Sequence, residues 1–331
     1  MCASLKQAAF QQVCISLISA ICALILWLNV DSWRSHEQFF LERDATLSFP
    51  SLESSVPTST LSLTCVGAPV LLIVLSSLAR YRCGIVFPTV AEQLGVEGIN
   101  NRARQATRFA TYYVLFDTIG LVQTVSITMC AYNGGKCFVG SLRPNFFAAC
   151  DYKGYAKALA SGDYSSYLAA TVPGAVGDRR HCLQSSEEAS LSFPSGHAAL
   201  AFAGMTYVTL ILRNLLSMRR DWRNHELGYS LGVQSRLDTP VENCPPLPKM
   251  ISATDAASCI PLLYASFVAC TRITDYKHRP ADVIVGGLIG VFAALGCRPR
   301  DIDAWWLAPF GRRELDGRET RRTGEQNQVS G

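Results

Sequence analysis

The sequence predicts an all-α protein, a polytopic membrane helical bundle with about six transmembrane helices. Charged residues make up 17% of the 331 residues, whereas soluble proteins have about 25%. The mean hydropathy is only +0.18, so the apolar residues must be concentrated in separate segments. Long stretches without Asp, Glu, Lys or Arg are present, and the longest exceed the roughly 20 residues that cross a bilayer. These observations exclude an ordinary soluble enzyme.

The first three spans follow from apolar stretches in the N-terminal half. The first two lie in the uncharged segments 7–30 and 54–79, and the first of these is too long for a signal peptide. Pro69 lies inside the second span, and we expect it to kink the helix without ending it. The third span is the apolar run 107–132, which carries Asp117 in its interior.

Three further spans follow in the C-terminal half. The fourth lies in the uncharged segment 193–212, and the fifth in 251–271, where Asp255 is near the start. The sixth runs from Ala281 to Cys297 and is short for a bilayer. The predicted helices cover residues 8–30, 60–80, 107–131, 194–215, 252–271 and 281–298, within one domain of residues 1–300.

The distribution of basic residues predicts the orientation. If the N-terminus is cytoplasmic, 19 of the 30 Lys and Arg residues fall on the cytoplasmic side, as the positive-inside rule expects. Both termini are then cytoplasmic. Residues 217–250 are polar and contain several prolines, which predicts a cytoplasmic loop, and residues 301–331 predict a disordered cytoplasmic tail. The net charge of +4 is too small and scattered to indicate nucleic-acid binding.

Cations and histidines gather in three short segments, each at the outer end of a predicted span. Charged groups beside a bilayer are costly unless they are paired or functional. Taken singly, Lys136 or Arg272 fits an interfacial anchor, but the joint spacing favours a common site. The three segments contain Lys136 and Arg143-Pro144; Pro194-Ser195-Gly196-His197; and Arg272, His278 and Asp282.

The cations and the Ser-Gly turn are suited to binding a phosphate. Lys136, Arg143 and Arg272 can neutralise the phosphate oxygens, and arginine matches their geometry with a bidentate fork. Ser195 and Gly196 at a helix start offer a hydroxyl and unpaired backbone N–H groups. These groups do the electrostatic work of a divalent ion, so we expect no metal and no other cofactor.

The two histidines predict transfer through a phosphohistidine. His278 and Asp282 are four residues apart, which places them on one face of a helical turn. The carboxylate can then hold one ring nitrogen while the other attacks phosphorus. His197 remains to protonate the leaving alcohol and later to deprotonate the hydrolytic water.

These segments resemble the three signature motifs of the type 2 phosphatidic acid phosphatase (PAP2) superfamily. Its pattern is Lys, six residues, Arg-Pro; then Pro-Ser-Gly-His; then Ser-Arg, five residues, His, three residues, Asp. The chain departs from it at Thr271, which replaces Ser and keeps the hydroxyl. The stretches 139–146 and 275–278 are most similar to eukaryotic lipid phosphate phosphatases.

The resemblance implies a membrane enzyme that hydrolyses phosphatidate to diacylglycerol without magnesium. Related substrates are lysophosphatidate, diacylglycerol pyrophosphate and sphingosine 1-phosphate. The implied site faces the lumen or the exterior, in the endoplasmic reticulum, Golgi or plasma membrane. The implied partners are the lipid phosphate and the membrane lipids, with a homo-oligomer left open.

Two other functions stay open at this stage. One is a phosphatase for polyprenyl diphosphates or phosphosphingolipids. The other is an inactive membrane scaffold, although such a relative should lack His278, His197 or a cation of the first segment, and all are present. Cys150 and Cys182 lie in one outer segment, where an oxidising lumen permits a disulfide without requiring it.

Overall fold

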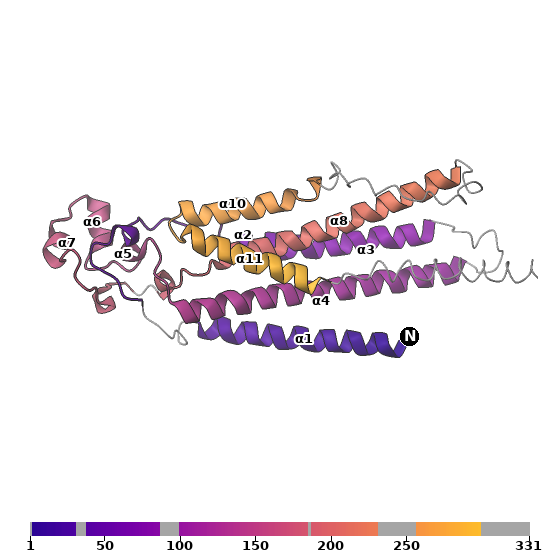
Figure 1. Cartoon of the computed structure of the whole chain (residues 1–331), viewed down its shortest axis with the longest axis horizontal. Helices are drawn as coiled ribbons and strands as arrows, with labels where there is room; N and C mark the ends of the chain where they lie inside the picture. Colours follow the sequence, from indigo (N-terminus) through magenta and orange to yellow (C-terminus); the bar gives the residue numbers. More distant parts are fainter. Residues whose placement is uncertain (1, 31–37, 87–98, 185–186, 231–255, 299–331) are drawn as a thin grey trace, which may run out of the picture.

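The computed structural model confirms the all-α bundle. It describes residues 2–30, 38–86, 99–184, 187–230 and 256–298. The long helices run along a common axis, and three short helices lie together at one end (Figure 1). The N-terminus of α1 lies at the opposite end of the bundle (Figure 1).

Among the described residues, five helical spans are long and apolar enough to cross a bilayer. The first, third and fourth spans are parts of longer helices, the second runs through two consecutive helices, and the last is a whole helix. The spans are Phe10–Asn29 in α1 (Cys2–Asn29), Thr58–Ala79 in α2 and α3 (Thr58–Ser62 and Ala68–Val86), Ala110–Val139 in α4 (Ile99–Val139), Gly196–Leu216 in α8 (Gly196–Ser230) and Pro280–Cys297, all of α11.

The fifth apolar segment of the sequence forms α10 (Ile260–Thr274), which is shorter than expected. Its 15 residues span about 22 Å, whereas the hydrocarbon core of a bilayer is about 30 Å thick. Pro261 occupies the first turn, where a proline needs no N–H acceptor and favours a helix start. The expected start at residue 252 lies outside the described part of the chain.

The expected cytoplasmic loop at 217–250 requires a correction at its start. Helix α8 continues to Ser230, so residues 217–230 are helical. This stretch has no proline and contains three Arg, one Met, one Glu and one Leu, which are good helix formers, so the helix runs past its apolar span. The rest of that loop and the tail 301–331 lie outside the described residues.

Pro69 interrupts the second span without ending it. A π-helical turn, Leu63–Gly67, connects α2 to α3. Pro69 has no N–H to donate to the carbonyl of Cys65, four residues earlier. A Cβ at Gly204 of α8 would collide with that same carbonyl, so the absence of a side chain there lets α8 approach the interrupted turn.

Glycines also bring α11 and α8 into backbone contact. A Cβ on Gly286 would meet the carbonyl oxygen of Ser195, and a Cβ on Gly290 would meet the carbonyl oxygen of Ala199. Two glycines four residues apart form a small-residue face that permits such close approach between membrane helices. This contact places the start of α11 against the start of α8.

Replacing Gly290 with alanine should therefore separate these two helices. We expect Gly290→Ala to destabilise the protein by about 2 kcal/mol, because the new methyl group overpacks the contact with Ala199. Gly296→Ala is the matched control, since a Cβ there has nothing within 4 Å. Thermal unfolding in detergent would measure both, and equal midpoints would contradict the packing argument.

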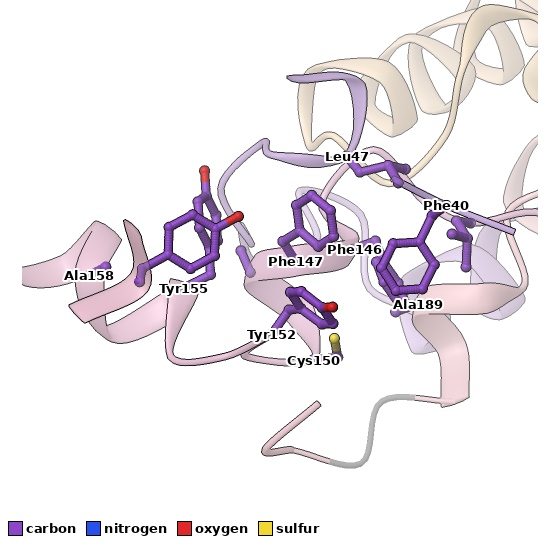
Figure 2. Packing of buried hydrophobic residues seen from close by; sticks show 12 residues of the cluster. Phe40, Leu47, Phe146, Phe147, Cys150, Tyr152, Tyr155, Ala158 and Ala189 are labelled. Carbon is purple, nitrogen blue, oxygen red and sulfur yellow. The ribbon is translucent and has the colours of Figure 1, made fainter. Parts of the chain in front are cut away.

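The end of the bundle opposite the N-terminus, which the sequence predicts to face outward, carries a small unit that we call the outer cap, residues 38–57, 140–184 and 187–195. It contains α5 (Phe146–Ala149), α6 (Tyr155–Ser161) and α7 (Ser165–Ala170). Its core is largely aromatic and forms without strands, with Phe40 packed edge-on against Phe146 and Tyr152 (Figure 2). A disulfide joins Cys150 to Cys182.

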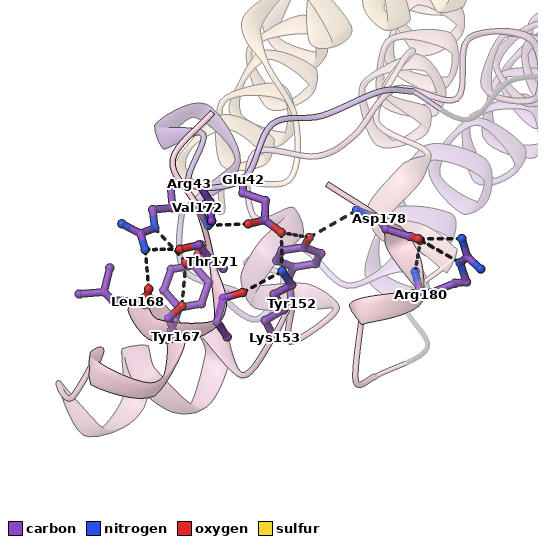
Figure 3. A network of polar contacts seen from close by, with 11 residues as sticks. Glu42, Arg43, Tyr152, Lys153, Tyr167, Leu168, Thr171, Val172, Asp178 and Arg180 are labelled. Carbon is purple, nitrogen blue, oxygen red and sulfur yellow. Dashed lines mark hydrogen bonds and ion pairs between the residues drawn. The ribbon is translucent and has the colours of Figure 1, made fainter. Parts of the chain in front are cut away.

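A buried carboxylate, that of Glu42, links separate segments of the outer cap through hydrogen bonds (Figure 3). Glu42 accepts hydrogen bonds from Lys153 Nζ at 2.6 Å, the Tyr152 hydroxyl at 2.7 Å and the Val172 N–H at 2.8 Å. Burial alone raises the pKa of Glu42, but these hydrogen bonds, led by that of Lys153, lower it from 4.5 to about 2.

Because its pKa is lower in the folded state, ionised Glu42 stabilises the outer cap above pH 4.5. That contribution should be lost as the pH falls from about 4.5 towards 2. We expect Glu42→Gln to cost about 3 kcal/mol at neutral pH, because it leaves the charge of Lys153 without its partner. Thermal unfolding between pH 3 and 7 would show a smaller acid-dependent loss in this variant, and the exposed Glu53→Gln is the matched control.

Candidate functional site

The three sequence segments meet where α4 ends and where α8 and α11 begin. Lys136 lies in the last turn of α4, and Arg272 in the last turn of α10. His197 is the second residue of α8, and Asp282 is in the first turn of α11. Figure 1 shows these helix ends on the side of the bundle that carries α5, α6 and α7.

Asp282 ties the third segment to the second through both its side chain and its backbone. Its Oδ2 accepts hydrogen bonds from the Ser192 hydroxyl at 2.5 Å and from the Arg279 N–H at 2.9 Å. Its carbonyl oxygen accepts the Ser195 N–H at 3.0 Å. A single buried residue therefore caps α11 and holds the chain that leads into α8.

His278 lies beside this carboxylate, although not in the way that the spacing suggested. Its Nδ1 is 3.7 Å from Asp282 Oδ2, longer than a hydrogen bond. The two residues do not share a helical turn, because α11 begins at Pro280 and Arg279 is its extended N-cap. The cap of α11, and not a helical repeat, brings the imidazole to the carboxylate.

The surroundings of His278 keep its imidazole neutral. Its side chain is 4% exposed, and burial lowers its pKa from 6.5 to about 4. The Asp282 carboxylate opposes this shift, whereas the positive charges of Arg143 and Lys136 add to it. These two cations belong to the first segment. A neutral imidazole retains the nitrogen lone pair that a nucleophile needs.

His197 faces the same group of charges from the second segment. It interacts electrostatically with Arg272, His278, Lys136 and Arg143. Its Nε2 is buried and has no hydrogen-bond partner among the described residues. The first and third segments therefore both act on His197, which belongs to the second.

Lys136 is positioned by an aromatic residue that the motif spacing did not identify. Its Nζ lies 5.4 Å from the centre of the Tyr132 ring, within cation–π range. The same ring packs on Gly196, where a Cβ would be 3.1 Å from Tyr132 Cε2. Tyr132 thus lies between the cation and the start of α8. An aromatic residue one helical turn before Lys136 was the only sequence signal for it.

The segment that contains Arg143 is hydrogen-bonded to the third segment and to the residues that lead into the second. The N–H of Arg143 donates to the carbonyl of Ala189 at 2.8 Å, and the N–H of Ser192 donates to Ser141 at 2.8 Å. Arg279 donates from Nη1 to the carbonyl of Leu142 at 3.0 Å. The sequence placed Arg279 only beside His278, whereas the structure makes it a bridge between the first and third segments.

Ser195 acts mainly as a helix cap. It is fully buried, and its N–H already donates to Asp282. Its Oγ accepts the N–H of Ala198 at 3.4 Å. The expectation that Ser195 offers an unpaired N–H is therefore wrong. The N–H groups of Gly196 and His197 belong to the first turn of α8 and have no acceptor within the helix.

Arg272 is buried at the end of α10 and is held by its own neighbours. Its Nη2 lies 2.8 Å from Asp275 Oδ2, and its Nε and Nη2 donate to the Thr271 hydroxyl at 3.2 and 3.1 Å. Thr271 therefore uses the hydroxyl that the family pattern supplies from Ser. In the sequence, Asp275 belongs only to the stretch 275–278 that resembles lipid phosphate phosphatases, and the motif pattern gives it no role.

The assembled groups combine cations, two histidines and the Asp282 carboxylate, with Asp275 held on Arg272. Such a set can bind a phosphate and exchange a phosphoryl group with an imidazole nitrogen. In the part of the chain that the structure describes, no three His, Cys, Asp or Glu side chains are grouped as metal ligands.

Known proteins are similar to this chain over part of its length. Lipid phosphate phosphatase 1 of Arabidopsis thaliana is 28% identical over 192 residues, which cover 57% of this chain and 46% of the relative. A Schizosaccharomyces pombe protein named "Probable diacylglycerol pyrophosphate phosphatase 1" is 25% identical over 256 residues, 76% of this chain and 67% of the relative. A Dictyostelium discoideum PA-phosphatase related-family protein is 25% identical over 182 residues, 54% of this chain and 44% of the relative.

The chain thus spans less than half the length of the Arabidopsis and Dictyostelium relatives. No solved structure matches it. A family model described as the PAP2 superfamily matches residues 117–303, a range that contains every candidate site residue. Because this match covers more than half of the chain, the protein belongs to the PAP2 superfamily.

Proposed function

We propose that this protein is an integral-membrane lipid phosphate phosphatase. Its substrates are phosphatidate, which yields diacylglycerol, and the related lysophosphatidate, diacylglycerol pyrophosphate and sphingosine 1-phosphate. The observation that carries the proposal is the buried His278, whose Nδ1 lies 3.7 Å from Asp282 Oδ2 where the three segments meet. The printed names of the relatives, which include lipid phosphate phosphatase, support the lipid class of substrate.

In the first step, Nε2 of His278 attacks phosphorus. The new N–P bond forms as the P–O bond to the lipid breaks. His197, which is protonated when the anionic phosphate is bound, gives its extra proton to the leaving alkoxide and becomes neutral. Nδ1 faces Asp282 Oδ2, so the carboxylate stabilises the positive charge that develops on the imidazole. Diacylglycerol or another lipid alcohol leaves, and with diacylglycerol pyrophosphate the leaving group is phosphatidate.

In the second step, water hydrolyses the phosphohistidine. Neutral His197 removes a proton from the water, whose oxygen attacks phosphorus while the N–P bond breaks. Inorganic phosphate leaves, and both histidines return to their initial states. Lys136, Arg143 and Arg272 neutralise the phosphate oxygens in both transition states, and the first N–H groups of α8 contribute to the same anion site. No step requires a divalent metal.

The proposed site faces the lumen or the cell exterior. The Cys150–Cys182 disulfide of the adjacent outer cap supports this orientation, because disulfides persist in oxidising compartments. The excess of basic residues at the other ends of the helices agrees with it, and both termini are then cytoplasmic. A lipid substrate would reach the site from the outer leaflet with its head group at the level of the helix ends.

A substrate panel tests the function. Purified protein in detergent micelles with EDTA should release phosphate from the lipid phosphates listed above. We expect His278→Ala to lower kcat at least about 1,000-fold, because it removes the nucleophile. The exposed His181→Ala is the matched control and should retain full activity. Full activity in His278→Ala, or an absolute need for magnesium, would overturn the mechanism.

The same panel separates the remaining alternatives. Selective hydrolysis of polyprenyl diphosphates or phosphosphingolipids would replace the broad specificity proposed here. Binding of lipid phosphates without any turnover would instead indicate an inactive membrane scaffold.

The pKa of His278 predicts an acid limit for activity. As the pH falls through about 4, His278 becomes protonated and loses its nucleophilic lone pair, so kcat/KM should fall about tenfold per pH unit below that value. Phosphate monoesters keep one negative charge there, because their second pKa is about 6. Removing the Asp282 charge in Asp282→Asn should move this acid limit of activity to lower pH, since the carboxylate raises the pKa of His278.

A shift to higher pH in Asp282→Asn would contradict this electrostatic account. Stability follows the same ionisation. Between pH 6.5 and 4 the unfolded chain binds a proton at His278 that the folded protein does not, so stability should decline across this window as the pH falls.

A further inference from the structure

A second buried carboxylate, Asp275, lies at the site and has no part in the mechanism above. It is 4% exposed and directly follows the last residue of α10. A carboxylate beside a phosphate site repels the bound anion. The presence of Asp275 there therefore needs another explanation. Its contacts indicate what that explanation is.

Asp275 fixes the orientation of the Arg272 guanidinium. Arg272 is 1% exposed, and its Nη2 forms an ion pair with Asp275 Oδ2 at 2.8 Å. Nη2 and Nε also donate to the Thr271 hydroxyl. These contacts engage one edge of the planar fork. Nη1, which carries two N–H groups, has a single described partner, the Ser54 hydroxyl at 3.4 Å.

Asp275 also fastens a segment of the outer cap to the site. We call residues 49–57 the strap. Ser55 donates to Asp275 twice, from its N–H at 2.9 Å and from its hydroxyl at 2.5 Å. Phe49 stacks on Tyr276, next to Asp275, with ring centroids 4.7 Å apart. The strap is thus held by the same turn that orients Arg272.

Electrostatics explains why the cation needs this partner. A guanidinium buried to this extent without a counter-charge would be strongly destabilising, so it would turn towards solvent when no phosphate is bound. Asp275 compensates the charge through one edge and leaves Nη1 for a second anion. The arrangement keeps Arg272 in place before the substrate arrives, which reduces the cost of ordering it on binding.

We propose that Asp275, supported by Ser55 of the strap, is a positioning residue that holds Arg272 ready to bind the phosphate group of the substrate. The proposal rests on the proposed function, since it assigns Arg272 to the same phosphate site. Asp275 touches neither phosphorus nor the leaving group. It acts through Arg272, and it makes phosphate affinity depend on a segment of the outer cap.

Calorimetric titration with orthovanadate, a phosphate analogue, tests this in detergent-solubilised full-length protein. We expect Asp275→Asn to weaken binding about tenfold and Ser55→Ala about threefold. Glu53→Gln removes an exposed carboxylate from the same strap and should leave the affinity unchanged. With lipid substrate, Asp275→Asn should raise KM more than it lowers kcat, because the residue acts on binding.

A double-mutant comparison distinguishes positioning from a general structural effect. In an Arg272→Lys background, Asp275→Asn should change vanadate affinity less than twofold, because the fork that it orients is already gone. The same tenfold loss in both backgrounds, or unchanged affinity in Asp275→Asn, would overturn the proposal. If Asp275→Asn does not fold, Ser55→Ala compared with Glu53→Gln decides the question.

The two proposals fail in different ways. A wild-type protein without phosphatase activity on any lipid phosphate would overturn the proposed function, while vanadate titration would still test Asp275. An active wild type whose vanadate affinity does not respond to Asp275→Asn or Ser55→Ala would overturn only the positioning role.

Discussion

The site depends on the backbone contact between α8 and α11. Gly286 and Gly290 let α11 lie directly against the carbonyl oxygens of Ser195 and Ala199. In a membrane the hydrophobic effect does not drive helices together, so close packing of this kind must hold them. The contact brings the first turns of the two helices together. It thereby places His278, next to the start of α11, near His197, which is 81 residues earlier in the chain.

Polar contacts then convert this packing into a defined geometry. Asp282 joins the second and third segments, and Arg279 joins the third to the first. Asp282 and Arg279 both lie at the start of α11, so these bonds converge on one helix end. Several charged groups therefore lie close together. Burial and the neighbouring cations both lower the pKa of His278, which favours the neutral imidazole.

The outer cap contributes to the site as well as covering one end of the bundle. Its aromatic core and the bonds to Glu42 stabilise the loops on which Arg143 and the strap lie. The N–H of Phe49 donates to the carbonyl of Pro144 at 3.2 Å, so the strap and the segment of Arg143 are directly connected. Arg272 is then held between α10 and the strap, through Thr271 and Asp275 on one side and Ser54 on the other.

The sequence by itself determined the all-α membrane bundle and its family, because uncharged spans and motif spacing are local properties that composition and order display directly. It also identified the charged residues that the helix ends bring together. Only the tertiary structure decided that α10 is short, that α8 extends to Ser230, and that an N-cap pairs His278 with Asp282. The same holds for Tyr132, Arg279 and Asp275, whose contacts join segments distant in the chain. No periodicity encodes such contacts, since they arise only when the helices pack.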